Sequence, residues 1–549
     1  MNAHIVKPGA LNLRSSIAVD PAERRALEAK GIWGDDTLSG WIADNVTRSG
    51  NASAVVTNDH TATYRNLAND IERFARGLYD LGVRTGDVVS VQLPNSSEFI
   101  VAYFAIARLG GVLSTVHMPY RTAEITTLLR HAGSVAFICY GAIKDFAPAH
   151  EVLVRKGELP ALEHVIAVGE PVAGTSSFSE LLRSEAALPA DITPVAANPF
   201  LLLFTSGTSA SPKAVPLTYQ MTLGNARAGA VEHGLCQGDK VLSVAPFTHL
   251  LGLYALHLTT KVAGSSILFP AFTPPDLAQA ITKHRPTVLV CAPAHLNGLM
   301  ISGLLENLDL SSIRLIITAG SALSPDVAKA VSKRLPAGFL TNLWGMTELQ
   351  AGLYTRPTDS FEIATTTSGR AAPGAEVRIA DHDDHPVAQG EEGELQIRGG
   401  LLFRGYYNNE DATRQAFTPD RWFRTGDLAV MDKSGNVRIT GRKTEIINRG
   451  GIKYNPLDIE IMLGNHPKVM EVAIIPYEDT VLGQKACCFV VPTDAYKPPT
   501  LEELCAHLIE GGVSKVKLPE RLEVIDEMPI TPTRKIIRGR LKALLARKL

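Results

Sequence analysis

A loop rich in hydroxyl and small side chains, with one lysine, is the segment best suited to binding phosphate. It follows an apolar run within residues 201–219, LLLFTSGTSASPKAVPLTY. Backbone N–H groups, hydroxyl donors and one positive charge suit a triphosphate. The spacing is not that of a Walker A loop, and a Ser/Gly-rich surface turn is the alternative interpretation. The candidate phosphate contacts are Thr205, Ser206, Gly207, Thr208, Ser209 and Lys213.

Four further motifs follow this loop along the chain. They are Trp344-Gly345-Met346-Thr347-Glu348, Arg424-Thr425-Gly426-Asp427, Gly441-Arg442-Lys443-Thr444-Glu445 and Pro529–Lys535. Together with the phosphate loop, they resemble the ordered motifs of the adenylate-forming superfamily, which includes acyl-CoA synthetases, adenylation domains of peptide synthetases and firefly luciferase. The resemblance covers nearly the whole chain after residue 30, and five motifs in order are far more specific than any single one.

The resemblance implies that the chain binds ATP. Trp344 would stack on the adenine, although a buried core tryptophan is the alternative. Asp427 would accept hydrogen bonds from the ribose hydroxyls, and Arg442 would contact the ribose or a phosphate. Without the family pattern, Thr-Gly-Asp would be interpreted as a turn. The expected lining of the base pocket comprises Gly320, Ser321, Ala322, Asn342 and Gly345.

The same resemblance implies a set of catalytic residues: Thr347, Glu348, Lys535 and His249. Glu348 matches a carboxylate that coordinates Mg²⁺, a hard ion that prefers oxygen ligands. Lys535 matches the late lysine that approaches the acid carboxylate and the α-phosphate, where negative charge accumulates. Taken alone, Lys535 would be a solvated lysine of a basic tail, and His249 would be a satisfied core histidine.

The segment around His249 indicates the kind of acid. His249 resembles the family's aromatic gate, and the expected acyl pocket comprises Phe247, His249, Leu250 and Leu253. Residues 23–42 are similar to stand-alone aryl-acid adenylating enzymes, in which an asparagine follows the gate histidine and contacts the acid. Leu250 occupies that place here, which disfavours a 2-hydroxybenzoate-type acid. The run LLGLYAL, if helical, would form an apolar wall for a cyclic, aromatic or medium-length acid.

Coenzyme A is the thiol acceptor that the sequence favours. Gly450 and Gly451 lie in the loop that, in CoA ligases of this family, lines the pantetheine channel after the C-terminal domain rotates about a hinge at Thr444. The long insertion of fatty acyl-AMP ligases is not evident after Arg442. Loading of a carrier-protein thiol is the alternative. An oxygen-using luciferase-like enzyme and a binding-only homologue also stay open.

Four departures from the family pattern concern conformation. Ala210 and Ala214 replace usual glycines in the phosphate loop, which would restrict a positive-φ geometry. Arg534 replaces the glycine that usually precedes the late lysine, and Thr444 stands where Asp or Lys is typical. None of these changes removes a catalytic group.

Alternating strand and helix patterns must position these motifs. Apolar segments at 87–93 and 135–140 alternate with helical patterns at 65–81 and 125–132, which predicts an α/β fold with parallel sheets. The rhythm recurs in 199–340, and after about residue 350 short glycine-rich strands predict a small β-barrel or distorted sheet. We therefore expect two α/β subdomains plus the small barrel in an N-terminal domain at 1–443, and a mobile α+β domain at 444–549.

Composition excludes several other classes of protein. The chain has 549 residues and a formal net charge of −2, so no global field attracts nucleic acid or an anionic membrane. The six cysteines show neither zinc spacing nor a disulfide framework. No apolar segment is long enough to span a membrane, and the N-terminus lacks a signal-peptide pattern. A cytoplasmic enzyme is expected, with a small carboxylic acid, ATP and CoA as partners and no nucleic acid.

Overall fold

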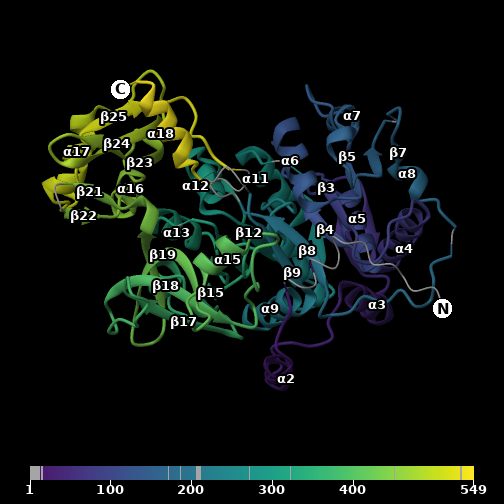
Figure 1. Ribbon diagram of the computed structural model, residues 1–549. Helices are drawn as coiled ribbons and strands as arrows, with labels where there is room; N and C mark the ends of the chain where they lie inside the picture. The colour runs from purple at the N-terminus through teal and green to yellow at the C-terminus, as the bar shows by residue number, and fades with distance from the viewer. Residues whose placement is uncertain are drawn as a thin grey trace.

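The computed structural model describes most of the chain. The described residues are 13, 17–170, 172–185, 187–205, 212–270, 272–321, 323–449, 452–531 and 535–548. Figure 1 shows a large body built from the first three quarters of the chain, with the C-terminal segment in yellow at one end of it. The α/β fold class expected from the sequence is confirmed.

The first sheet has seven strands and is parallel except at one edge, where β8 and β9 run antiparallel. In spatial order its strands are β7 (Ser176–Ser177), β6 (His164–Val168), β5 (Ala136–Tyr140), β3 (Val88–Gln92), β4 (Val112–Thr115), β8 (Pro199–Phe204) and β9 (Ala214–Thr218). The helices near this sheet are α3 (Leu38–Ser49), α4 (Tyr64–Asp80), α5 (Ser97–Arg108), α6 (Thr122–Ala132), α7 (Pro148–Val154) and α8 (Phe178–Leu181). Helix α2 (Pro21–Ala29) has no buried residue and lies apart from the sheet (Figure 1).

Both faces of this sheet are buried, because successive side chains of a strand point to opposite faces and nearly all of them are buried in β3, β4 and β5. In β5, Ala136 and Ile138 join the central core, whereas Phe137 and Cys139 pack with α6 and α7 on the other face. The helices and strands expected at 65–81, 87–93, 125–132 and 135–140 are confirmed as α4, β3, α6 and β5.

The second sheet has nine strands, parallel at its centre and antiparallel at both ends. In spatial order its strands are β16 (Arg370–Ala371), β15 (Leu353–Tyr354), β14 (Phe339–Trp344), β13 (Leu315–Ala319), β12 (Val288–Cys291), β10 (Lys240–Ser243), β11 (Ser265–Ile267), β1 (Ser53–Val56) and β2 (Thr61–Thr63). Its helices are α9 (Tyr219–Glu232), α10 (Leu250–Lys261), α11 (Pro274–His284), α12 (Pro293–Ile301), α13 (Pro325–Ser332) and α14 (Phe361–Thr366).

The central core joins the two sheets. One cluster of buried side chains contains Val89 and Leu201 of the first sheet, Val290 and Ile317 of the second, and much of α5 and α10. The run that begins at Leu250 is therefore a buried helix, as the sequence suggested. This helix places its first turn beside the ends of strands from the second sheet, where ligands commonly bind.

The glycine-rich strands after residue 370 form a four-stranded antiparallel sheet with β17 and β20 at its edges. They are β17 (Ala375–Ala380), β18 (Glu392–Gly399), β19 (Phe423–Met431) and β20 (Val437–Arg442), with α15 (Glu410–Ala416) between β18 and β19. Figure 1 shows this small sheet in green below the C-terminal segment.

The C-terminal segment has its own sheet and its own two cores. Its strands are β21 (Ile447–Arg449), β22 (Ile452–Tyr454), β23 (Val469–Asp479), β24 (Gly483–Pro492) and β25 (Arg521–Val524), and its helices are α16 (Leu457–Leu463), α17 (Leu501–Glu510) and α18 (Arg538–Ala546). The 3₁₀ turns of the chain are η1 (Lys156–Glu158), η2 (Leu304–Asn307), η3 (Lys443–Glu445) and η4 (Lys515–Lys517). Within the described residues, no helix is long and apolar enough to cross a membrane.

Candidate active site

A cavity of about 710 Å³ lies where loops of the large body meet the C-terminal segment. Both parts contribute to its wall, since Glu348 and Lys213 come from the large body and Lys535 and Arg538 from the C-terminal segment. The predicted site residues that line it are Thr205, Lys213, His249, Leu250, Gly320, Gly345, Thr347, Glu348, Arg442, Thr444 and Lys535. The structure thus brings together residues that lie more than 300 positions apart in the sequence.

The charged part of the cavity has the Glu348 carboxylate near Lys213 and Lys535, and Glu445, Arg442 and Arg538 also line the cavity. Glu348 is buried and accepts a hydrogen bond from the Tyr406 hydroxyl, with 2.8 Å between Oε1 and Oη. Burial raises the pKa of Glu348, while the Tyr406 hydrogen bond and the charges of Lys213 and Lys535 oppose that rise. The Lys213 ammonium lies 5.0 Å from the centroid of the Tyr406 ring, a cation–π distance.

Lys535 is held by the turn on which it sits. Its backbone N–H donates to Thr531 Oγ1 at 3.0 Å, and its carbonyl accepts from the Thr531 N–H at 2.7 Å. Burial lowers the pKa of Lys535, and Arg442 lowers it further, whereas Asp427 and Glu348 act in the opposite direction. A lysine in this environment can still place a positive charge beside the carboxylate end of the cavity.

Asp427 joins two of the residues expected to bind the nucleotide. The Trp344 indole N–H donates to its Oδ2 at 2.8 Å, and the Arg442 Nε lies 2.7 Å from its Oδ1. Asp427, Trp344, Asn342 and Ser321 lie outside the lining of the cavity itself. The link between Trp344 and Asp427 fixes the plane of the indole ring, because an indole N–H donates in only one direction.

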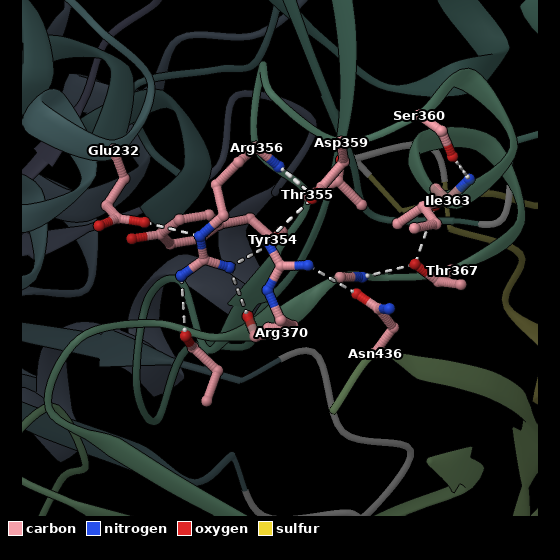
Figure 2. A network of polar contacts seen from close by, with 12 residues as sticks. Glu232, Tyr354, Thr355, Arg356, Asp359, Ser360, Ile363, Thr367, Arg370 and Asn436 are labelled. Carbon is pink, nitrogen blue, oxygen red and sulfur yellow. Dashed lines mark hydrogen bonds and ion pairs between the residues drawn. The ribbon is translucent and has the colours of Figure 1, made fainter. Parts of the chain in front are cut away.

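A buried polar network supports Asn342 from behind. The Asn342 amide nitrogen donates to the Thr367 carbonyl at 2.9 Å, and its backbone N–H donates to Thr355 Oγ1 at 2.8 Å. Figure 2 shows how Arg356 and Arg370 extend this network to neighbouring elements. Arg356 pairs with Glu232 at the end of α9.

The second arginine of the network reaches the small sheet. Arg370 donates to Asp359 at 2.8 Å and to Asn436 at 3.2 Å. Asn436 lies in the turn between β19 and β20, the two strands that carry Asp427 and Arg442. The network therefore ties the expected adenine and ribose residues to one another through partly buried ion pairs.

Away from the charged residues, the wall of the cavity is formed mostly by apolar side chains. Leu250, Leu251 and Tyr254 of α10 line it together with Phe269 and Phe272. His249 caps α10, with its Nδ1 accepting from the Leu251 N–H at 3.3 Å. Burial lowers the pKa of His249 far below its usual value, and His117 and Lys535 add to that effect. The imidazole at this position is therefore neutral.

Two residues expected in the acyl pocket do not line the cavity, which corrects the sequence interpretation. Phe247 packs against Phe99 in the central core, with 5.5 Å between ring centroids, and Leu253 is fully buried there. The reason for Leu253 is helical phase, since each residue advances about 100°. Leu250, Leu251 and Tyr254 share one face, and Leu253 lies beside it.

The phosphate loop is only partly described. Thr205 and Lys213 close its base, because the Thr205 N–H donates to the Lys213 carbonyl at 3.0 Å. Ala214 is a buried residue of β9, paired with Phe204, and does not have a positive φ. The restriction anticipated at Ala214 is therefore absent. The expected residues Ser206, Gly207, Thr208, Ser209, Ala322, Gly450 and Gly451, and the departures Ala210 and Arg534, lie outside the described residues.

The segment around Thr444 is anchored on both sides. Lys443 pairs with Glu394 of β18 at 2.8 Å. Glu445 pairs with Arg538 of α18 at 3.0 Å, and Arg538 also makes a two-pronged contact with Glu460 of α16 at 2.7 and 2.8 Å. Arg538 lies three residues after Lys535, so this ion-pair cluster helps to position the lysine.

Tyr406 and Gln350 are among the residues of the cavity that sequence reasoning missed. Tyr406 follows Arg404-Gly405 in a segment without an obvious chemical signature, and only the fold brings it to Glu348. Gln350 is 6% exposed and has φ 70°. That left-handed conformation costs an ordinary side chain on the order of 1–2 kcal/mol. The only sequence signal for Gln350 was its place two residues after the Glu348 motif.

Thr205, Lys213, the buried Glu348 and Lys535 lie around one cavity, and the family of the chain is shown by comparison with known proteins. The chain matches the AMP-binding enzyme family over residues 42–407 and the AMP-binding enzyme C-terminal domain over residues 458–535. It therefore belongs to the AMP-binding, adenylate-forming enzymes.

Relatives of known name include both CoA ligases and carrier-loading enzymes. The chain is 28% identical over 543 residues to the medium-chain fatty-acid–CoA ligase of Escherichia coli, covering 98% of this chain and 95% of that protein. It is 33% identical over 534 residues to the salicyl-AMP ligase / salicyl-S-ArCP synthetase of Mycobacterium tuberculosis, covering 94% and 92%. The crystal structure of the anthranilate CoA ligase AuaEII with anthranoyl-AMP has a TM-score of 0.86 and 26% identity, covering 94% and 98%.

Proposed function

We propose that this enzyme activates a hydrophobic carboxylic acid with ATP and transfers the acyl group to coenzyme A. The observation that carries the proposal is the single cavity in which an apolar wall from α10 meets Lys535, Glu348 and Arg442. Such a cavity can hold a hydrophobic acid with its carboxylate beside the expected α-phosphate site.

In the first half-reaction, an oxygen of the acid attacks the α-phosphorus of ATP. The P–O bond to pyrophosphate breaks, and the acyl-adenylate remains. Lys535 would stabilise the negative charge on the carboxylate and phosphate oxygens during attack, and Lys213 would hold the outer phosphates. The neutral imidazole of His249, and the apolar wall behind it, would exclude water from the reactive acyl-adenylate.

The residues present fit a magnesium ion. Mg²⁺ is usually held by one or two carboxylates together with substrate phosphates, and Glu348 offers one buried carboxylate that accepts a hydrogen bond from the Tyr406 hydroxyl. No larger group of His, Cys, Asp and Glu that could hold a metal occurs among the described residues. When bound, Mg²⁺ would neutralise phosphate charge.

In the second half-reaction, the thiolate sulfur of CoA attacks the acyl carbonyl carbon. The bond between that carbon and the adenylate oxygen breaks, and AMP leaves. Loading of a carrier-protein thiol is the second candidate, because the salicyl-S-ArCP synthetase of M. tuberculosis is 33% identical to this chain. Leu250, in place of the asparagine of aryl-acid enzymes, favours a more hydrophobic acid than salicylate.

The proposal is tested with a panel of acids that includes octanoate, cyclohexanecarboxylate, benzoate, salicylate, acetate and amino acids. ATP/pyrophosphate exchange reports adenylation, and mass spectrometry reports the thioester formed with CoA or with a phosphopantetheinylated carrier protein. We expect hydrophobic acids to give the highest kcat/KM and CoA to be acylated. Preference for acetate or an amino acid would contradict the acid class, and acylation of the carrier protein alone would contradict CoA. Oxygen consumption without CoA-dependent AMP release would indicate a luciferase-like reaction.

A further inference from the structure

The loop that carries His249 follows β10 of the second sheet and leads directly into α10. It spans residues 244–249, and most of its residues line the cavity. The His249 N–H donates to the Pro246 carbonyl at 2.9 Å, which closes the loop as a turn. A Cβ at Gly252 of α10 would approach the Pro246 carbonyl oxygen to 2.2 Å. The 244–249 loop therefore sits directly on the first turn of the helix.

The first half of this loop is fastened by Asn95, which lies three residues after β3 of the first sheet. The Asn95 side-chain amide donates to the Ala245 carbonyl at 3.0 Å and to the Ser243 carbonyl at 3.4 Å. Its Oδ1 accepts from the Phe247 N–H at 2.7 Å. Asn95 is buried, so water cannot readily replace these hydrogen bonds. A side chain of the first sheet thus fixes the backbone of a loop of the second.

The second half of the loop is held by residues at the end of β4. The Thr115 hydroxyl donates to the Thr248 carbonyl at 2.7 Å, and His117 Nδ1 lies 3.0 Å from the Thr248 hydroxyl oxygen. Thr115, His117 and Thr248 are all buried. Both the backbone and the side chain of Thr248 are therefore fixed from the first sheet, immediately before His249 in the chain.

The His249 ring is itself in contact with His117. The two imidazoles stack with 6.3 Å between centroids and 30° between planes. Burial lowers the pKa of His117 to about 4, and it also lowers the pKa of His249. Two neutral rings can pack together without the repulsion that two imidazolium ions would experience. His117 is thus a support for the ring that lines the cavity.

These contacts lie at the ends of strands from both sheets. The parallel strands β3 and β4 end at Gln92 and Thr115, and β10 ends at Ser243. Asn95 and Met118, which follow β3 and β4, line the same cavity as His249. The carboxyl ends of parallel strands are the usual place for a ligand, and the hydrogen bonds fix one set of strand ends relative to the other.

We propose that Asn95, Thr115 and His117 are positioning residues that hold His249 where it meets the acid. This inference rests on the proposed function, in which His249 and the apolar wall enclose the acyl group. The three residues act through the 244–249 loop, because they bond to its backbone and to the Thr248 side chain. A small displacement of such a loop is enough to impair binding in a preorganised site.

The effect of loosening the loop should be confined to the acid. The expected nucleotide contacts Trp344, Asp427 and Arg442 belong to β14, β19 and β20. They are tied to one another by hydrogen bonds and ion pairs that do not involve the 244–249 loop. A loss of fold as a whole would instead weaken both substrates, so the two KM values separate positioning from general instability.

The test uses Thr115→Val and Thr248→Val, each of which keeps a β-branched side chain and removes one hydroxyl. The KM for ATP and the KM for the acid are measured by ATP/pyrophosphate exchange, with the acid of the panel above that gives the highest kcat/KM. The matched control is Thr259→Val, because Thr259 is a buried threonine of α10 whose hydroxyl donates to the Ala255 carbonyl of the same helix at 2.7 Å.

We expect Thr115→Val and Thr248→Val each to raise the KM for the acid by about 3- to 10-fold, the usual effect of losing a neutral hydrogen bond. The KM for ATP should stay unchanged, and Thr259→Val should alter neither value. In a His249→Ala enzyme, the same two substitutions should change the KM for the acid by less than about twofold, because residues that act through one another are not additive.

Three results would overturn the inference: an unchanged KM for the acid in both variants, an equal rise in both KM values, or an undiminished effect in the His249→Ala enzyme. Thr115→Val and Thr248→Val remove different hydroxyls, so one suffices if the other does not fold. Should His249→Ala give no exchange, the two KM values compared with Thr259→Val decide the question. Absence of exchange with every acid in the wild type would instead contradict the proposed function.

Discussion

Removing one hydroxyl from Tyr406 should weaken the magnesium-dependent step. In Tyr406→Phe, Glu348 loses the donor 2.8 Å from its Oε1, while the buried ring remains. A hydrogen bond to a charged group contributes about 1.5–3 kcal/mol, and Glu348 is only 5% exposed, so solvent cannot replace it. The expected loss in adenylation rate at limiting Mg²⁺ is therefore about 10- to 100-fold.

The same substitution should change the pH profile. The functional form of Glu348 is the carboxylate, so activity is present above its pKa and is lost as pH falls through it. Burial already raises this pKa, and the Tyr406 hydrogen bond lowers it. Without that bond the pKa rises further, and the acid limb of the adenylation rate should move to higher pH.

The assay is ATP/pyrophosphate exchange as a function of Mg²⁺ concentration and of pH. Tyr407→Phe is the matched control, because it removes a hydroxyl from the adjacent buried tyrosine, which pairs with Asn408 and not with Glu348. We expect Tyr406→Phe, and not Tyr407→Phe, to need more Mg²⁺ for half-maximal rate. An unchanged Mg²⁺ dependence together with an unchanged acid limb would refute the role given to Tyr406.

Substitutions at three other positions address different parts of the site. Lys535→Ala should slow acyl-AMP synthesis by about 10²–10³-fold, while supplied acyl-AMP should still react with CoA. An equal loss of rate in the two half-reactions, measured separately, would contradict this expectation. Because the pKa of Lys535 is lowered, wild-type adenylation should fall as pH rises through that pKa, and Lys535→Arg should move the fall to higher pH. Trp344→Phe deletes the N–H that donates to Asp427. In steady-state kinetics the KM for ATP should therefore rise about 10-fold, while the KM for the acid stays unchanged. A raised KM for the acid with an unchanged KM for ATP would be evidence against the anchoring role of the indole ring. Leu250→Asn should raise kcat/KM for salicylate relative to octanoate by about 10-fold or more, and an unaltered ratio would exclude Leu250 as a determinant.

The order of elements could be predicted from sequence because periodicity reports burial directly. Residues 136–139 are apolar throughout and pack alternately into two cores, and such a continuous apolar run is typical of a strand buried on both faces. The motif residues Glu348, Arg442 and Lys535 could likewise be predicted to meet, since the family pattern gives their neighbourhood. Their roles remain predictions that the proposed experiments test.

Tertiary contacts account for what the sequence could not predict. Tyr406 reaches Glu348 across 58 positions, and no local pattern encodes that approach. Leu253 was assigned to the pocket because an apolar run does not reveal which helix face meets the cavity and which meets the core. The expected constraint at Ala214 disappeared because the residue belongs to β9 and not to the turn.

The two ion pairs that flank Thr444 affect how far the C-terminal domain could travel. Lys443 is tied to the small sheet and Glu445 to α18, so a rotation that kept both pairs would be taken up by the backbone torsions between these two residues, φ and ψ of Thr444 among them. Those two torsions are narrowed by a β-branched side chain. The range of angles through which the domain that carries Lys535 can rotate would then depend on the φ and ψ values that are open to Thr444.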